Sequence, residues 1–325
     1  MNRLLKNKCN FIAQSILCCV ITFFYSSIVH AQAENVNHSI IQVNKVCARS
    51  AVECLELVEV ELKRTTPNTY IWYDLLQHKF DALFDLQKIS ELNKAVTPWI
   101  DQEKLPNSFK ITVYIYYAKT SFIQEDIDRA YLYSQKAKNK LIEMNQVFPS
   151  PMRLIQLANL QMRLNEDDLA YETLQALEKK YEKSKNAHFM MELYGNLGHV
   201  TRNLSLHELS LEYCLKTIPW SKKYNNQQQI GTVLFNLAKA YLHFGHYNKA
   251  EKTLHEAQEF SKKAKDEVKV NQIQLYLIEI KLQQLQTQQA KILFDQINVN
   301  YLPKSDLPKI TKLQKTLSGL PIAVN

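Results

Sequence analysis

The feature that most constrains this chain is a pattern of small and apolar residues that recurs every 40 positions. One column of the pattern contains Ala118, Ala158, Gly198, Ala238 and Ile278, and a second contains Ala130, Ala170, Ser210, Ala250 and Ala290. A third column contains Ser134, Leu174, Cys214, Leu254 and Phe294. A repeat period between about 20 and 50 residues is typical of solenoids, in which each unit buries its apolar face against its neighbours.

The spacing inside one unit predicts a pair of helices. Apolar residues fall at i, i+1 and i+4 in the first half and at i, i+4 and i+7 in the second, at Leu237, Ala238, Tyr241, Ala250, Leu254 and Ala257. Gly245 lies between the two halves and indicates a helix stop. Because the chain has only 5 glycines and 9 prolines in 325 residues, tight β-turns are scarce and we predict an all-α fold.

These residues resemble the tetratricopeptide repeat, through the succession Leu234, Leu237, Ala238, Tyr241, Gly245, Tyr247, Ala250, Leu254 and Ala257. The ordinary unit has about 34 residues, and the longer unit is similar to that of exported bacterial proteins with repeats of about 40 residues. The resemblance implies a right-handed superhelical solenoid of antiparallel helix pairs. It predicts five hairpins in residues 105–300 and a C-terminal capping helix and tail in residues 301–325. Residues 32–104 are expected to form an N-terminal helical cap, and the alternative is a cap that contains a degenerate repeat.

Residues 1–31 have the pattern of a secretory signal peptide. Arg3, Lys6 and Lys8 precede an apolar run from residue 11 to residue 29, and small residues near Ala31 offer a cleavage site. We therefore expect a periplasmic or secreted protein that has no membrane segment after cleavage. The alternative is an uncleaved helix that anchors the chain in the membrane, because the apolar run is nearly long enough to span a bilayer.

Export favours a disulfide between Cys47 and Cys54. On one straight helix these residues would lie roughly 10 Å apart, which exceeds the reach of a disulfide of about 4.4 to 6.8 Å between Cα atoms. The bridge therefore requires a helix that starts between them, and Ser50 with Glu53 forms a capping-box sequence there. The alternative is two free thiols. Cys214 lies in an apolar column and is expected to be a core residue.

No sequence pattern predicts an enzyme, a cofactor or a metal site. Phosphate-binding glycine motifs do not occur, and His207 and Glu208 lack the second histidine of a zinc-protease helix. The close pair His243 and His246 has no third ligand beside it in the sequence. The net charge of +8 includes three cations of the signal peptide, and without aromatic interleaving it does not predict nucleic-acid binding.

The resemblance assigns the first helix of each hairpin to a concave groove. Mapped by the repeat, the expected groove residues are Asn159, Arg163, Asn196, His199, Arg202, Phe235, Asn236, Lys239 and His243, followed by Leu275, Tyr276, Glu279 and Gln283. Asparagine amides can hold a peptide backbone, and neighbouring cations favour an acidic side chain or a terminal carboxylate. The alternative is a hydrated polar groove without a selected ligand.

The first hairpin departs from this scheme because its inner helix contains the aromatic stretch VYIYYAKTSF, with Tyr116 and Phe122 at groove positions. We expect helices in residues 50–95 to cover this surface, and the alternative is an apolar binding groove. The sequence as a whole predicts an exported, non-enzymatic scaffold or adaptor that binds a protein or peptide, and the groove cations favour an acidic one. The alternative function is a periplasmic sensory or regulatory module that acts with a separate signalling protein. The sequence does not predict the oligomeric state.

Overall fold

The computed structural model describes residues 40–319, so the predicted signal peptide and the last six residues lie outside the described part. The chain divides into two units, residues 1–46 and residues 47–325. Of the first unit the structure describes residues 40–46, which are helical. Within residues 40–319 all regular structure is helical, and no helix there is long and apolar enough to cross a membrane.

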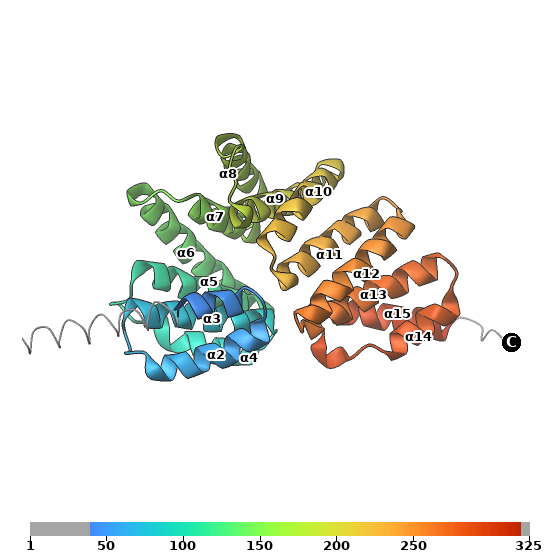
Figure 1. Cartoon of the computed structure of the whole chain (residues 1–325), viewed down its shortest axis with the longest axis horizontal. Coiled ribbons are helices and arrows are strands. Elements are labelled where there is room, and N and C mark those ends of the chain that lie inside the picture. Colours follow the sequence, from blue (N-terminus) through green and yellow to red (C-terminus); the bar gives the residue numbers. More distant parts are fainter. Residues whose placement is uncertain (1–39, 320–325) are drawn as a thin grey trace, which may run out of the picture. The chain divides into compact units, whose positions relative to one another are not determined.

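Five helical hairpins make up most of the second unit, which is an all-α solenoid (Figure 1). They are α5 (Asn107–Ile123) with α6 (Ile127–Val147), α7 (Pro151–Arg163) with α8 (Asp167–Lys180), α9 (Ala187–Asn203) with α10 (His207–Tyr224), α11 (Gln227–His243) with α12 (Tyr247–Lys263), and α13 (Glu267–Gln283) with α14 (Thr287–Asp295). Each hairpin packs against the next along the chain.

The repeating columns form the seam between the paired helices. Ala238 and Ala250 are fully buried where α11 meets α12, and Ala158 and Ala170 are fully buried in the equivalent seam of α7 and α8. In the seam of α9 and α10, a Cβ atom at Gly198 would lie 3.4 Å from Cys214 Sγ. The small residues therefore permit the close approach of each helix pair.

The hairpin turns also repeat every 40 residues, although only one contains glycine. The backbone is left-handed at Glu125, Asn165, Ser205, Gly245 and Leu285, with φ between 59° and 70°. At each turn the next residue donates its N–H to a carbonyl five residues earlier, as His246 does to Tyr241. These bonds satisfy the carbonyls at the end of the first helix and fix the turn.

Short helices flank the hairpins on both sides. At the N-terminal side lie α2 (Ala51–Arg64), α3 (Tyr70–Asp85), α4 (Ile89–Val96) and η1 (Thr97–Trp99), and at the C-terminal side lie η2 (Val299–Tyr301), η3 (Lys304–Asp306) and α15 (Leu307–Ser318). α15 buries Ile310, Leu313 and Leu317 against α13 and α14.

A disulfide joins Cys47 to Cys54 at the start of α2, with 4.4 Å between the Cα atoms. The helix begins between them, because the Ser50 hydroxyl accepts the N–H of Glu53. The Glu53 carboxylate pairs with Arg49 at 2.5 Å, so Ser50 provides only one half of a capping box. Cys214 is free and buried.

The aromatic stretch of α5 packs against α3. Tyr116 is buried, its ring contacts Phe80 and Phe84, and its hydroxyl donates to the Asp81 carboxylate. Phe122, in contrast, keeps 55% of its surface exposed at the end of α5. The N-terminal helices thus cover the centre of the stretch and leave its C-terminal end in solvent.

Candidate functional site

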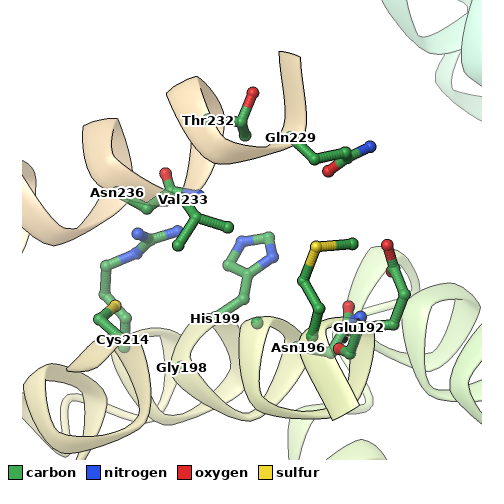
Figure 2. Close-up of a pocket in the computed structure, with 12 residues that line it drawn as sticks. Glu192, Asn196, Gly198, His199, Cys214, Gln229, Thr232, Val233 and Asn236 are labelled. Atoms are coloured by element: carbon green, nitrogen blue, oxygen red, sulfur yellow. Dashed lines mark hydrogen bonds between the residues drawn. The ribbon is translucent and has the colours of Figure 1, made fainter. Parts of the chain in front are cut away.

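The candidate site is a pocket between the inner helices α9 and α11, with a volume of about 250 Å³. Four of the expected groove residues line it, namely Asn196, His199, Arg202 and Asn236. Figure 2 shows His199 between the two helices, with Glu192 and Gln229 toward one end of the pocket and Cys214 and Asn236 toward the other. The repeat therefore brings together polar residues that lie up to 44 positions apart in the sequence.

Helical spacing explains why one helix contributes so many of these side chains. Glu192, Asn196, His199 and Arg202 follow one another at intervals of four, three and three residues, which places them on one face of α9. The Asn196 side chain donates to the backbone carbonyl of Glu192 at 2.7 Å. The Asn196 side chain also hydrogen-bonds the Glu192 carboxylate, with which it shares the pocket. Asn196 is therefore partly engaged within α9 and offers only its remaining hydrogen-bonding capacity to a ligand.

Three cations lie on the inner helices of three successive hairpins: Arg163 on α7, Arg202 on α9 and Lys239 on α11. Within the described residues, no carboxylate lies within the 4.0 Å salt-bridge distance of any of them. The Lys239 ammonium lies 5.6 Å from the ring centre of Phe235 and 5.8 Å from that of Tyr276. The surface formed by the inner helices α7, α9 and α11, here called the inner wall, thus carries positive charge. No ion pair within the described part of the protein neutralises the charges of these three cations.

The crowding of these charges changes the protonation of their neighbours. Burial, followed by the positive charges of Arg202, Lys269 and Lys309, lowers the pKa of Lys239 to about 8. Partial desolvation between the helices, followed by the charges of Arg202 and Lys239, lowers the pKa of His199 to about 4, although the residue keeps an exposed surface. At neutral pH the His199 imidazole is therefore uncharged and can accept as well as donate a hydrogen bond.

A bound anion would relieve this repulsion, because it would supply the negative charge that the wall lacks. The arrangement can therefore bind an acidic group by charge and orient it by the amides of Asn196 and Asn236. Burial also raises the pKa of the Cys214 thiol. The thiol is consequently not an activated nucleophile.

Several expected groove residues occupy other environments. Phe235 is buried and its ring packs edge-on against Tyr276, so it supports the wall instead of contacting a ligand freely. Leu275 is fully buried. His243 lies against His207 with 3.8 Å between ring centres and an angle of 36° between the ring planes, outside the pocket lining. Asn159 and Arg163 are both exposed on α7, and both lie outside the pocket lining.

Three further charged residues, Glu192, Lys119 and Asp85, also lie in unusual environments, and the 40-residue register places Lys119 at a groove position of the first hairpin. Glu192 lines the pocket one turn before Asn196, and this spacing alone was a signal that could have identified it. Lys119 lies over the rings of Phe84 and Tyr116, at 4.1 Å and 4.4 Å, and burial lowers its pKa to about 8. Desolvation, followed by the negative charge of Asp81, raises the pKa of Asp85 to about 7, although the residue keeps an exposed surface at the end of α3.

Comparison with known proteins supports the repeat. Residues 189–263 match the family model of the tetratricopeptide repeat, whereas no curated protein sequence matches the chain. Among solved structures, a Rap protein complexed with competence and sporulation factor is similar at 14% identity and a TM-score of 0.59, with 88% of this chain and 87% of that chain covered. Aspartyl phosphate phosphatase F from Bacillus subtilis is similar at 12% identity and a TM-score of 0.51, with 88% and 83% covered.

These identities show a shared fold and leave the ligand undefined. The fold, the 40-residue register of buried small residues and the matched segment all agree on the same helical repeat. Residues 189–263 are therefore tetratricopeptide repeats, and the solenoid to which they belong has the fold of tetratricopeptide repeat proteins.

Proposed function

We propose that this protein is a non-catalytic scaffold or adaptor that binds an acidic peptide segment along the inner helices. The observation that carries the proposal is the row of Arg163, Arg202 and Lys239, which have no carboxylate within salt-bridge distance among the described residues. An acidic ligand would pair with these cations, and charged hydrogen bonds of this kind contribute about 1.5 to 3 kcal/mol each.

The length of the ligand follows from the repeat. Packed helices occupy about 10 Å each, so the inner helices of three successive hairpins span roughly 20 Å. An extended peptide covers at most about 3.3 to 3.6 Å per residue. A segment of about six residues can therefore contact all three cations.

A panel of synthetic hexapeptides tests the proposal, with acidic residues replaced in turn by glutamine and binding measured by titration calorimetry. We expect the acidic members to bind more tightly than their glutamine analogues. Arg202→Ala should weaken binding about 10- to 100-fold and flatten its salt dependence, because one screened charge is lost. Asn236→Ala should weaken binding and leave the salt dependence intact, since an amide carries no net charge.

Lys262→Ala is the matched control, because Lys262 lies in the last turn of α12 and its side chain is 55% exposed. This variant should bind as the wild type does. Equal affinity of the wild type for acidic and glutamine peptides, or equal losses in Lys262→Ala and Arg202→Ala, would contradict the proposal.

We also propose that the protein is exported, either free in the periplasm or secreted, or held by an uncleaved N-terminal helix. The disulfide between Cys47 and Cys54 supports this placement, because such bonds persist in oxidising compartments. Cell fractionation followed by non-reducing mass spectrometry should find a peptide that links the two cysteines and an N-terminus near residue 32. Recovery of reduced cysteines from the cytosol would contradict export.

A regulatory role is the second candidate. The similar Rap structure is a complex with competence and sporulation factor, and a ligand-bound solenoid in the same fold favours a module that transmits binding to a separate signalling protein. Co-purification with the peptide present and absent distinguishes the two roles. A scaffold retains its partner in both conditions, whereas a sensor gains or loses one.

A further inference from the structure

The pocket between α9 and α11 carries opposite charges at its two ends. Arg202 lies in the last turn of α9, and Glu192 lies ten residues earlier on the same helical face. A helix rises about 1.5 Å per residue, so the two positions are separated by roughly 15 Å along the pocket. His199 lies between them and is uncharged at neutral pH, because its pKa is lowered to about 4.

The Glu192 carboxylate is the unusual member of this surface. Within the described residues it has no lysine or arginine within salt-bridge distance, and burial raises its pKa. His188, one turn earlier on α9, stacks on Tyr224 with 4.7 Å between ring centres. His188 and the hydrogen bond from Asn196 oppose this rise in pKa, but neither supplies the permanent positive charge of a lysine or arginine. A ligand cation would therefore stabilise the half-buried carboxylate further.

The two ends therefore select different groups of one ligand. We propose that the pocket binds a dipolar peptide segment, in which a positively charged group pairs with Glu192 and an acidic group pairs with Arg202. An extended chain advances about 3.3 Å per residue, so the two ligand charges are separated by four or five residues. This inference rests on the proposed function and adds a basic position to the acidic peptide.

The surrounding polar groups fit this orientation. Gln229 lies toward the Glu192 end and Asn236 toward the other end (Figure 2). Their amides can bind the peptide backbone between the two charged positions, because each amide has both donor and acceptor atoms. The ligand is thus held by backbone contacts in the middle and by opposite charges at its ends.

Selection from a displayed library of random linear heptapeptides tests the proposal. The wild-type protein should enrich peptides with Lys or Arg four or five positions from Asp or Glu. Glu192→Gln should still enrich the acidic residue and lose the preference for the basic one, and Arg202→Gln should do the reverse. Glu182→Gln, a substitution of an exposed carboxylate outside the pocket, should select the wild-type motif.

One selected peptide then measures the pairing directly. Replacing its basic residue by glutamine should weaken binding to the wild type about 10-fold or more. The same replacement should leave affinity for Glu192→Gln nearly unchanged. Thermal unfolding should show that Glu192→Gln is at least as stable as the wild type, because the variant removes a half-buried charge.

The outcomes separate this inference from the proposed function. Enrichment of acidic peptides without a basic position, with the same motif selected by Glu192→Gln, would overturn the dipolar ligand and leave the acidic-peptide function intact. Failure of the wild type to enrich any charged motif would overturn both.

Discussion

His199 is the residue whose chemistry the inner wall changes most clearly. Its pKa falls from an ordinary 6.5 to about 4, first because of partial desolvation between the helices and then because of the charges of Arg202 and Lys239. In the unfolded chain the imidazole binds a proton near pH 6.5, so between pH 6.5 and pH 4 the unfolded state holds more protons than the folded state. The stabilising contribution of neutral His199 is therefore present above pH 6.5 and is lost as the pH falls toward 4.

A proton NMR titration measures this shift directly, with the signal assigned by comparison with His199→Gln. We expect His199 to titrate near pH 4 in the wild type. In Arg202→Gln its pKa should rise, because a neighbouring positive charge is gone, and in Lys239→Gln it should rise less, since Lys239 is the smaller cause. A midpoint near 6.5 in the wild type would show that the cations do not face His199.

The residues of the pocket show how far the sequence predicts a site. The 40-residue register predicts that Asn196, Arg202 and Asn236 share the inner face, because helical periodicity fixes direction. It does not predict that Phe235 is buried, since that depends on the neighbouring Tyr276 of α13. Glu192 was missed because the expected groove positions of this hairpin began at Asn196, one helical turn after Glu192.

At the scale of the element, the buried small residues of each hairpin are the part that the sequence predicts best. Ala250 is fully buried in the seam of α11 and α12, and Ala250→Leu should overpack it and lower the free energy of unfolding by about 1 to 3 kcal/mol. Lys262→Leu on the same helix should change stability little. Chemical denaturation of the two variants compares them, and similar losses would be inconsistent with the assigned seam.

The hairpin turns are the part of the element that the sequence predicts least. Among the left-handed residues of the five hairpin turns, Gly245 and Asn165 are of types that favour this conformation, whereas Glu125, Ser205 and Leu285 are not. The left-handed backbone is unfavourable for L-residues. It is maintained by the backbone hydrogen bonds in which the residue after each turn donates its N–H to a carbonyl at the end of the first helix. Turn geometry in this repeat therefore depends on hydrogen bonds that residue propensities do not reveal.

Leu285 provides a test of that strain, because its side chain is exposed and its φ is 60°. Leu285→Asn should raise the free energy of unfolding by about 0.5 to 1 kcal/mol, since asparagine tolerates this conformation better. Gly245→Ala is the opposite change, with open space around the added Cβ. It should destabilise by about 1 kcal/mol, and an unchanged midpoint in both variants would refute the interpretation.

At the scale of the whole molecule, the N-terminal end of the second unit is closed by a covalent bond. The disulfide between Cys47 and Cys54 spans seven positions at the start of α2. A loop of this length stabilises a fold by about 2 kcal/mol in the chain-entropy model. The Cys47→Ser and Cys54→Ser double variant should therefore unfold at a lower denaturant concentration than the wild type. In Cys214→Ser the disulfide should remain intact, because Cys214 is not one of its partners.

The central claim about the molecule is that its ligand lies along the inner helices of successive repeats. A peptide selected by the wild type, carrying a photoreactive group, tests this claim by cross-linking and mass spectrometry. We predict cross-links within Ala187–Asn203 and Gln227–His243, the helices α9 and α11 that form the pocket, and their loss in Arg202→Gln. Cross-links confined to the outer helices α10 and α12 would contradict the account.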